Sequence, residues 1–421
     1  MDKLFALFYE TSGVSTDTRN IQENCMFIAL KGGNFNGNLF AQEALDKGAK
    51  YAIVDEVDKA DDQDIFYVDN GLIFLQKLAN YHRNQFDIPV IGITGSNGKT
   101  STKELIHTIL STQFNVLYTI GNLNNHIGVP ITLLRLTNEH DIMIVEMGAN
   151  QPDDITELCE IAEPDHGIIT NIGKAHLEGF KNLEGVIKTK SALYHSVSAK
   201  QGTVFYNTDD QVLTPILPSN TKNHSYGTVN GEIQGVLHEL TPYIKMKWSK
   251  TNYSSPIIET KMIGKYNFYN FLAAICIGNH FDVTEENICK AIQGYIPDNN
   301  RSQVQKTDKN TLIVDCYNAN PTSMSLALES FNLIDHPKKI AIIGDMLELG
   351  ADGIMEHENV IQYCIDNEID FFTVGPLFRS INENGFMNTK EVETILSNLE
   401  DCLIMLKGSR GIRLEKLIDV L

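Results

Sequence analysis

The sequence lacks an excess of basic residues, paired cysteines and long apolar runs. Lysine and arginine number 34 against 54 aspartates and glutamates, so the formal net charge is −20. A chain with this charge repels nucleic acid and anionic membranes as a whole, and a phosphate-bearing ligand needs a focused local site. We therefore expect an enzyme that acts on small molecules and has no nucleic-acid partner.

The seven cysteines are dispersed, and none of them forms a CxxC pair or a cluster with histidine. Such a set is typical of reduced thiols in a cytoplasmic protein. No apolar run approaches membrane-spanning length, and the first residues do not have the pattern of a signal peptide. We expect a cytoplasmic protein without membrane insertion.

The strict phosphate-loop pattern is also incomplete, because Ile93 stands where that pattern has its first glycine. Residues 90–94 nevertheless form a short apolar run, a glycine-rich turn follows, and residues 105–110 have apolar side chains at helical spacing. A strand, a glycine loop and a helix in this order bring backbone N–H groups and a positive helix end to one point, which suits a polyphosphate. The predicted nucleotide-binding residues are Gly95, Ser96, Asn97, Gly98, Lys99, Thr100 and Ser101.

Within this loop, Lys99 is expected to reach the outer phosphates and Thr100 to ligate magnesium. The alternative is a glycine-rich turn between a strand and a helix that binds nothing. That alternative leaves the Gly-Lys-Thr run at the start of an amphipathic helix without a purpose.

The length of 421 residues is too great for one ordinary core. We predict an α/β protein of three domains: a small α/β domain over 1–86, a central P-loop-type ATPase domain with a mainly parallel sheet over 87–297, and a Rossmann-like doubly wound domain over 298–421. Residues 203–262 alternate polar and apolar side chains and are expected to extend the central domain with antiparallel strands.

Polar side chains follow two predicted strands of the central domain. Glu146 ends the strand over 142–145, and the loop 171–176 follows the strand over 167–170. Because ligands lie beyond the carboxyl ends of strands in open α/β sheets, we expect both beside the phosphate loop. A solvated strand-end carboxylate and an ordinary loop are the alternatives. In the first domain, the polar loops 15–19 and 31–38 suit a sugar or nucleotide and equally a surface turn.

Taken together, these motifs resemble the Mur ligase family across all three predicted domains. The segments that carry the resemblance are 95–100, 122–125 with 128–130, 146–149, 175–180, Lys190, Arg301, 315–321, 344–350 and 407–411. The closest resemblance is to the members that join D-alanyl-D-alanine to UDP-N-acetylmuramoyl-tripeptide in peptidoglycan synthesis. The resemblance implies that ATP phosphorylates a substrate carboxylate and that the incoming amine then attacks the acyl phosphate.

The resemblance also implies two magnesium ions and a carbamylated lysine. It makes Lys99, Glu146, His176 and Lys190 catalytic, and the implied metal ligands are Thr100, Glu146, His176 and Lys190 as its carbamate. Lys190 is preferred to Lys188 because it begins the family's lysine-x-x-aliphatic-aromatic frame. Taken without the resemblance, Lys190 is a helix surface charge and His176 a loop histidine bonded to backbone.

The remaining site residues are likewise implied by the resemblance. ATP contacts are expected at Asn267 and Asn270 near adenine, where Tyr266 replaces the usual histidine, and at Arg301 and Asp315. In the first domain, Asn36-Gly37-Asn38 replaces the family's Asp-Gly-His. The expected substrate contacts are Asp17, Thr18, Arg19, Asn124, Asn125, Tyr317, Asn318, Asn320, Lys407, Ser409 and Arg410. For Lys407, Ser409 and Arg410, a helix-capping turn is the alternative.

Three other functions remain open at this point. The chain could add the third stem residue, act as a folylpolyglutamate synthase, or bind ATP without ligation as a nucleotide sensor. Folylpolyglutamate synthases usually lack a uridine-binding first domain, and binding alone needs no second metal. We expect a monomer, and no motif predicts the third residue of the tripeptide.

Overall fold

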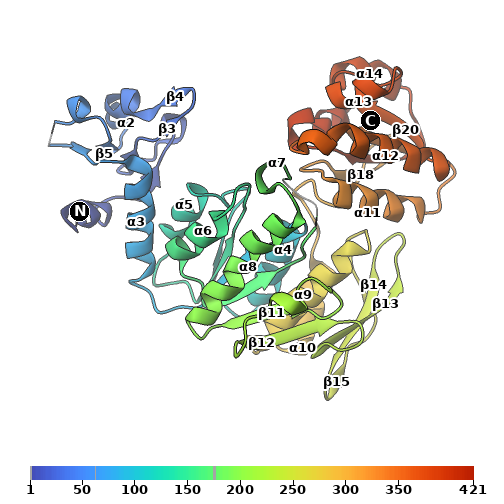
Figure 1. Cartoon of the computed structure of the whole chain (residues 1–421), viewed down its shortest axis with the longest axis horizontal. Coiled ribbons are helices and arrows are strands. Elements are labelled where there is room, and N and C mark those ends of the chain that lie inside the picture. Colours follow the sequence, from blue (N-terminus) through green and yellow to red (C-terminus); the bar gives the residue numbers. More distant parts are fainter. Residues whose placement is uncertain (1, 62, 174–176) are drawn as a thin grey trace. The chain divides into compact units, whose positions relative to one another are not determined.

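The computed structural model describes residues 2–61, 63–173 and 177–421 (Figure 1). The chain divides into two compact units. Unit 1 comprises Met1–Gly92, Phe114–Gly148 and Asp154–His166, and unit 2 comprises Ile93–Gln113, Ala149–Asp153 and Gly167–Leu421. The three domain ranges expected from the sequence stay a prediction. Among the described residues, no helix combines the length and the apolar character needed to cross a bilayer.

Unit 1 begins with a parallel sheet of four strands in the order β1-β2-β5-β6. Apolar side chains of β2 and β5, among them Phe27 and Val54, pack against Ala41 and Ala44 of the following helix. The elements here are α1 (Asp2–Phe8), β1 (Val14–Ser15), β2 (Met26–Ile28), β3 (Lys31–Gly32), β4 (Phe35–Asn36), α2 (Ala41–Asp46), β5 (Tyr51–Val54), β6 (Ile65–Tyr67) and α3 (Gly71–Arg83).

The remainder of unit 1 pairs two parallel strands, β8 and β9. Every residue of β9 is buried, as expected for a strand that has both faces covered. Helix α3 packs against α5 and α6. The elements are β8 (Val116–Tyr118), α5 (Gly128–Leu133), β9 (Ile142–Glu146) and α6 (Asp154–Ala162).

Strand β7 (Val90–Thr94), which is fully buried, and strand β10 (His166–Ile169), which is buried except at His166, each have residues in both units. Unit 2 continues from β7 into α4, whose apolar face packs against α9. The other elements of this part are α4 (Lys99–Leu110), α7 (Leu177–Phe180), α8 (Leu183–Ala199), β11 (Thr203–Asn207), β12 (Lys222–Gly227), β13 (Ile233–Glu239), β14 (Lys245–Lys250), β15 (Tyr253–Ser254), β16 (Ile258–Glu259), α9 (Tyr266–His280) and α10 (Glu285–Gly294).

The expectation of an antiparallel extension over 203–262 is wrong for its first strands. Strands β11, β12 and β13 pair in parallel, and only β14, β15 and β16 are antiparallel to their neighbours. The long connection over 208–221, which contains the short helix Thr214–Ile216, returns the chain so that β12 runs in the direction of β11. Alternation is confirmed in β14, where Met246 and Trp248 are buried.

The last part of unit 2 is a five-stranded sheet in the order β17-β18-β21-β19-β20. Alternate residues enter two cores: Ile313, Ile343 and Met405 face one, while Val314 and Ile342 face the other. The sheet is therefore covered on both faces, as predicted, although the antiparallel edge strand β17 was not expected. The elements are β17 (Gln303–Lys306), β18 (Thr311–Asp315), α11 (Pro321–Asn332), β19 (Lys339–Gly344), α12 (Gly353–Asp366), β20 (Asp370–Val374), α13 (Pro376–Ile381), α14 (Thr389–Leu396) and β21 (Leu403–Lys407).

A titratable group in α4 makes the stability of unit 2 depend on pH. Burial, with a contribution from the nearby charge of Lys103, lowers the pKa of His107 from 6.5 to about 4. Above pH 6.5 the imidazole is neutral in both the folded and unfolded states. Between pH 6.5 and 4, His107 binds a proton in the unfolded chain but not in the folded chain. The free energy of unfolding therefore falls as the pH falls.

Replacing His107 by glutamine should therefore flatten the pH dependence of unfolding. Because the side chain is partly exposed, we expect wild type to lose about 1–2 kcal/mol more than His107→Gln between pH 7 and pH 5. Urea unfolding at the two pH values measures the difference. His195→Gln, a change at an exposed position of α8, is the control and should behave as wild type. Equal losses in wild type and His107→Gln would contradict the assignment.

Candidate functional site

The predicted phosphate loop joins β7 to α4 with the backbone shape that only glycine accepts at two positions. Gly95 has φ +146° and Gly98 has φ +79°. A Cβ atom added at Gly95 would lie 1.9 Å from the Thr170 hydroxyl oxygen, and one at Gly98 would lie 2.7 Å from Asn270 Oδ1. Gly98 is the N-cap of α4 and brings no capping side chain. The backbone N–H groups of the first helical turn are therefore not capped by that residue.

The loop is fastened to the segment that follows β10. The Asn171 side chain accepts a hydrogen bond from the Asn97 N–H at 3.0 Å and donates one to the Asn97 carbonyl at 2.9 Å. Ser96 is bonded through its hydroxyl to both the N–H and the carbonyl of Gly173, at 2.9 and 3.0 Å. Lys99 Nζ donates to the Gly95 carbonyl at 2.7 Å, so the ammonium group folds back over the loop. The loop is thus rigid and carries a positive charge.

Beside the loop lies a cavity of about 580 Å³ in unit 2. Its volume is in the range of nucleotide and cofactor pockets. It brings together many of the predicted residues, namely Ser96, Asn97, Gly98, Lys99, Thr100, Ser101, Asn267, Asn270, Arg301, Asp315, Asn318, Asn320 and Lys407. Tyr317, Ser409 and Arg410 do not line the cavity.

The cavity wall also contains residues that the sequence analysis missed. Asn207 ends β11, Asp209 and Asp210 follow it, and Tyr269 donates a hydrogen bond to Asp209 Oδ2 at 3.2 Å. Their position just beyond the carboxyl end of a strand is the same signal that singled out Glu146. It was overlooked because β11 was expected to be part of an antiparallel extension.

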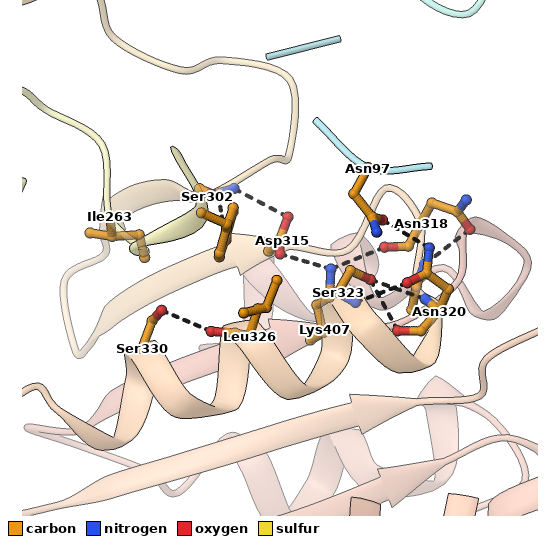
Figure 2. Close-up of polar contacts among 12 residues, drawn as sticks. Asn97, Ile263, Ser302, Asp315, Asn318, Asn320, Ser323, Leu326, Ser330 and Lys407 are labelled. Carbon is orange, nitrogen blue, oxygen red and sulfur yellow. Dashed lines mark hydrogen bonds and ion pairs between the residues drawn. The ribbon is translucent and has the colours of Figure 1, made fainter. Parts of the chain in front are cut away.

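The C-terminal sheet contributes a cationic group to the cavity (Figure 2). Lys407 is buried and its Nζ lies 2.8 Å from Asp315 Oδ2 and 3.1 Å from the Asn318 carbonyl oxygen. Two guanidinium groups lie near the Tyr317 ring, with the Arg301 Cζ 4.2 Å and the Arg410 Cζ 5.3 Å from its centroid. Among the described residues, Arg301 Nε is buried without a hydrogen-bond partner. An acceptor from a ligand would satisfy this donor.

One hydrogen bond connects the phosphate loop to the start of α11. Asn320 Nδ2 donates to Asn97 Oδ1 at 2.8 Å, as Figure 2 shows. Asn320 is also the N-cap of α11, where its side chain accepts from the Ser323 N–H at 2.9 Å. In the part of the chain that the structure describes, Asn97 Nδ2 is buried and has no partner, so a second buried donor is available at the cavity.

Glu146 and Asn124 lie together in unit 1. Asn124 Nδ2 donates to Glu146 Oε1 at 2.8 Å, and the Glu146 N–H donates to the Thr119 hydroxyl at 3.0 Å. Asn125 Oδ1 accepts from the N–H groups of Ile127 and Gly128, at 3.1 and 2.9 Å. The closeness of Glu146 to the phosphate loop stays a prediction, as does the substrate role of Asn125.

Two of the predicted metal ligands, His176 and Lys190, lie between residues 174 and 190. His176 lies outside the described residues, whereas Lys190 is described. Lys190 of α8 is 1% exposed, and its Nζ lies 5.9 Å from the centroid of the Phe180 ring. Lys188 on the same helix is exposed. The preference for Lys190 over Lys188 therefore agrees with their burial, and its role as a metal ligand stays a prediction.

The predicted nucleotide end of the substrate site lies in unit 1. Arg19 forms a bidentate ion pair with Asp17, whose hydrogen bonds to Arg19 lower the Asp17 pKa to about 2. Asn38 is buried and bonds Asp55 through both ends of its amide, at 2.7 and 2.8 Å. The two replacements in the Asn36-Gly37-Asn38 segment thus serve the internal structure of this loop. Thr18 follows Asp17 at the start of a short 3₁₀ helix.

The conformation of Gly98 leads to a direct test. Gly98→Ala should lower the affinity for ADP at least tenfold, because a residue with Cβ at φ +79° is strained by about 1 kcal/mol and its Cβ meets Asn270. Isothermal titration calorimetry measures the affinity. Gly294→Ala is the control, since a Cβ there meets nothing within 4 Å. Unchanged ADP affinity in Gly98→Ala would show that the loop does not hold the nucleotide.

Three consecutive ranges of the chain match domains of one protein family, the Mur ligases. Residues 10–83 match the Mur ligase family, catalytic domain, residues 93–278 the Mur ligase middle domain, and residues 300–400 the Mur ligase, glutamate ligase domain. The three matches cover most of the sequence in the order expected for three domains. The architecture is accordingly a three-domain α/β fold with mainly parallel sheets.

Individual relatives are similar over nearly the whole chain. The UDP-N-acetylmuramoyl-tripeptide–D-alanyl-D-alanine ligase of Bacillus subtilis strain 168 is 33% identical, with 96% of this chain and 92% of that protein covered. The crystal structure of MurF from Acinetobacter baumannii has a TM-score of 0.87 at 28% identity and covers 96% of this chain and 92% of its own. MurF from Thermotoga maritima, solved in complex with ADP, has a TM-score of 0.87 at 25% identity and covers 97% of both chains. The chain belongs to the Mur ligase family and is of the MurF type.

Proposed function

We propose that this protein uses ATP to join D-alanyl-D-alanine to UDP-N-acetylmuramoyl-tripeptide in the cytoplasm, as a step of peptidoglycan synthesis. The observation that carries the proposal is the near-complete match to relatives named for this ligation, together with a cavity that begins at a glycine loop and ends at Arg301 and Lys407. None of the seven cysteines, all of which the structure describes, is part of a disulfide, in keeping with a reducing compartment. We expect the active form to be a monomer.

The physical problem in this reaction is to bring two anions together. A carboxylate is a poor electrophile, and its conversion to an acyl phosphate supplies a leaving group. A carboxylate oxygen of the tripeptide attacks the γ-phosphorus of ATP, and the bond to the bridging oxygen of ADP breaks. The amine of D-alanyl-D-alanine then attacks the carbonyl carbon, inorganic phosphate leaves, and the amine loses a proton.

The residues of this chain would supply positive charge and hydrogen-bond donors along that path. The phosphate loop offers its N–H groups and Lys99 to the β- and γ-phosphates. Arg301 and Lys407 line the opposite wall of the cavity and can neutralise charge on the transferred phosphate. Asp209 and Tyr269 line the same cavity and are hydrogen-bonded to each other, and we expect them to contact ribose and base. The donors Arg301 Nε and Asn97 Nδ2 support the binding of an anionic ligand.

Magnesium fits the donor types that the chain provides. The Thr100 hydroxyl and the buried Glu146 carboxylate are hard oxygen ligands of the kind Mg²⁺ prefers. A carbamate on Lys190 would add two oxygens and exchange a buried cation for an anion. Bound metal would screen the approach of carboxylate to γ-phosphate. His176 completes the proposed ligand set. Among the described residues, no group of three His, Cys, Asp or Glu side chains forms a metal site by itself.

The reaction can be tested directly with purified protein. ATP, magnesium, UDP-N-acetylmuramoyl-tripeptide and D-alanyl-D-alanine should yield ADP, phosphate and the pentapeptide product, identified by mass spectrometry. The competing reactions are the addition of diaminopimelate or lysine to UDP-N-acetylmuramoyl-dipeptide and the addition of glutamate to a folate. A rate of product formation with D-alanyl-D-alanine at least 100-fold above the rates of these reactions would support the proposal. Turnover with another acceptor would assign a different ligase of the family, and ATP binding without product would indicate a sensor.

The proposed carbamate gives a second test. Lys190→Ala should lower kcat at least 100-fold, because the oxygen ligands of the second metal are lost. Added formate or acetate should restore part of that activity by occupying the vacated space. Lys188→Ala removes an exposed lysine two residues away and should keep wild-type activity. Retained activity in Lys190→Ala, or failure of short acids to restore any, would contradict the carbamate.

A further inference from the structure

We propose that Tyr266, Asn267 and Ser302 form a buried hydrogen-bonded link that positions Arg301 and Asp315 relative to the phosphate-binding helix α4. The inference rests on the proposed ligase function, since its purpose is to align two walls of one cavity for phosphoryl transfer. The three residues would act through Arg301 and Asp315 and are therefore positioning residues.

The first half of the link runs between two packed helices. Thr102 of α4 donates to Asn270 Oδ1 of α9 at 3.1 Å, and Asn270 Nδ2 donates to Asn267 Oδ1 at 2.9 Å. Asn267 Nδ2 then donates to the Ile263 carbonyl at 2.7 Å and to the Ser302 hydroxyl at 3.1 Å. Thr102 and Asn267 are fully buried, so these bonds do not compete with water.

The second half of the link passes through the connection to the C-terminal sheet. Tyr266 Oη and Ser302 Oγ are 2.7 Å apart. The Ser302 N–H donates to Asp315 Oδ1 at 3.3 Å, and Asp315 Oδ2 holds Lys407 Nζ at 2.8 Å. Figure 2 shows Ser302, Asp315 and Lys407 following one another along this path. The path therefore joins the helix of the phosphate loop to two charged residues of the opposite wall.

The backbone at Ser302 explains why a link is needed there. Asn300 and Ser302 both have left-handed φ values, +56° and +49°, which is an unfavourable conformation for serine. The Ser302 side chain is 2% exposed and is held by two partners on α9. Burial raises the pKa of Tyr266 well above its ordinary value, so this partner remains a neutral phenol. Arg301 is covalently tied to Ser302, so the conformation that the link imposes also sets the direction of Arg301.

The same contacts change the interpretation of the two asparagines. Both line the cavity, yet the amide of Asn267 is bonded to Ile263, Ser302 and Asn270, and Asn270 Oδ1 is bonded to Thr102. Their polar atoms are directed into the link. A role in holding the two walls together accounts for these bonds, whereas a role in reading the edge of adenine leaves them unexplained.

Three variants test the link through kinetics. Tyr266→Phe and Ser302→Ala each remove only a hydroxyl, while Ser302→Gly removes the hydroxyl and also relieves the backbone strain. We expect each variant to lower kcat about tenfold, since small misplacements of catalytic groups have effects of this size or larger. ADP affinity, set mainly by the phosphate loop, should stay within about threefold of wild type. The Tyr266→Phe/Ser302→Ala double variant should be no slower than Ser302→Ala alone.

Ser255→Ala is the matched control. Ser255 is a buried serine that accepts from the Trp248 N–H at 3.0 Å and donates to the Pro256 carbonyl at 2.8 Å, away from the cavity. Its kcat should stay within about twofold of wild type, which separates positioning from general loss of structure. The proposal is overturned if Tyr266→Phe or Ser302→Ala keeps the kcat of wild type, or if kcat and ADP affinity fall by the same factor in these variants. It is also overturned if Ser302→Gly has the kcat of wild type.

Hydrogen exchange distinguishes failure of the link from failure of the proposed function. The backbone amides of residues 299–303 should exchange faster in Tyr266→Phe and Ser302→Ala than in wild type and Ser255→Ala. This readout holds even if the wild-type protein forms no product, in which case the ligase proposal alone would fail. Equal exchange in all four proteins would overturn the link whatever the activity.

Discussion

The structure of the site depends on the hydrogen bonds that hold the phosphate loop against the segment after β10. A single amide, that of Asn171, bonds both the N–H and the carbonyl of Asn97, much as a neighbouring strand would. The Thr170 hydroxyl donates to the same carbonyl at 2.6 Å and occupies the space where a side chain at Gly95 would lie. With its shape fixed before any ligand arrives, the loop needs no reorganisation to surround a phosphate.

From this fixed point, polar contacts extend in two directions. Asn97 meets the start of α11 through Asn320, while α4 meets α9 and the connection at Ser302 through buried amides and hydroxyls. The first path ends at Asn320, the N-cap of α11, and the second continues to Asp315 and Lys407 of the C-terminal sheet. A protein with a net charge of −20 thereby concentrates Lys99, Arg301 and Lys407 around one cavity. Local focusing of this kind allows an acidic protein to hold a polyphosphate.

Much of the fold was predictable because its signals are local. The apolar run before Gly95 is buried in β7, and the C-terminal sheet is covered on both faces, as expected for a doubly wound domain. The direction of β12 and β13 was not predictable, since alternation along a strand does not reveal whether its neighbour is parallel. The loop that returns the chain decides this, and its course depends on tertiary packing.

The site was predictable to the same degree and for related reasons. Motif residues such as Lys99, Asn320 and Lys407 reach the cavity because each follows or ends a strand or opens a helix, and such positions can be inferred from sequence. The interaction between Tyr266 and Ser302 could not be inferred, because 36 positions separate the two residues. Tyr266 was singled out only as a replacement for histidine beside adenine, and Ser302 has no charge or metal-binding group that would have pointed to a role. Asp209 was missed only because the strand before it was assigned to the wrong kind of pairing.

The contact between Asn97 and Asn320 has a consequence for how substrates come and go. It joins two uncharged amides, so its strength is insensitive to ionic strength and to pH. A neutral hydrogen bond of this kind contributes about 1 kcal/mol, close to thermal energy. Thermal motion can therefore break and re-form this hydrogen bond many times in each catalytic cycle. The hydrogen bond favours one arrangement of the cavity walls without preventing the release of a product.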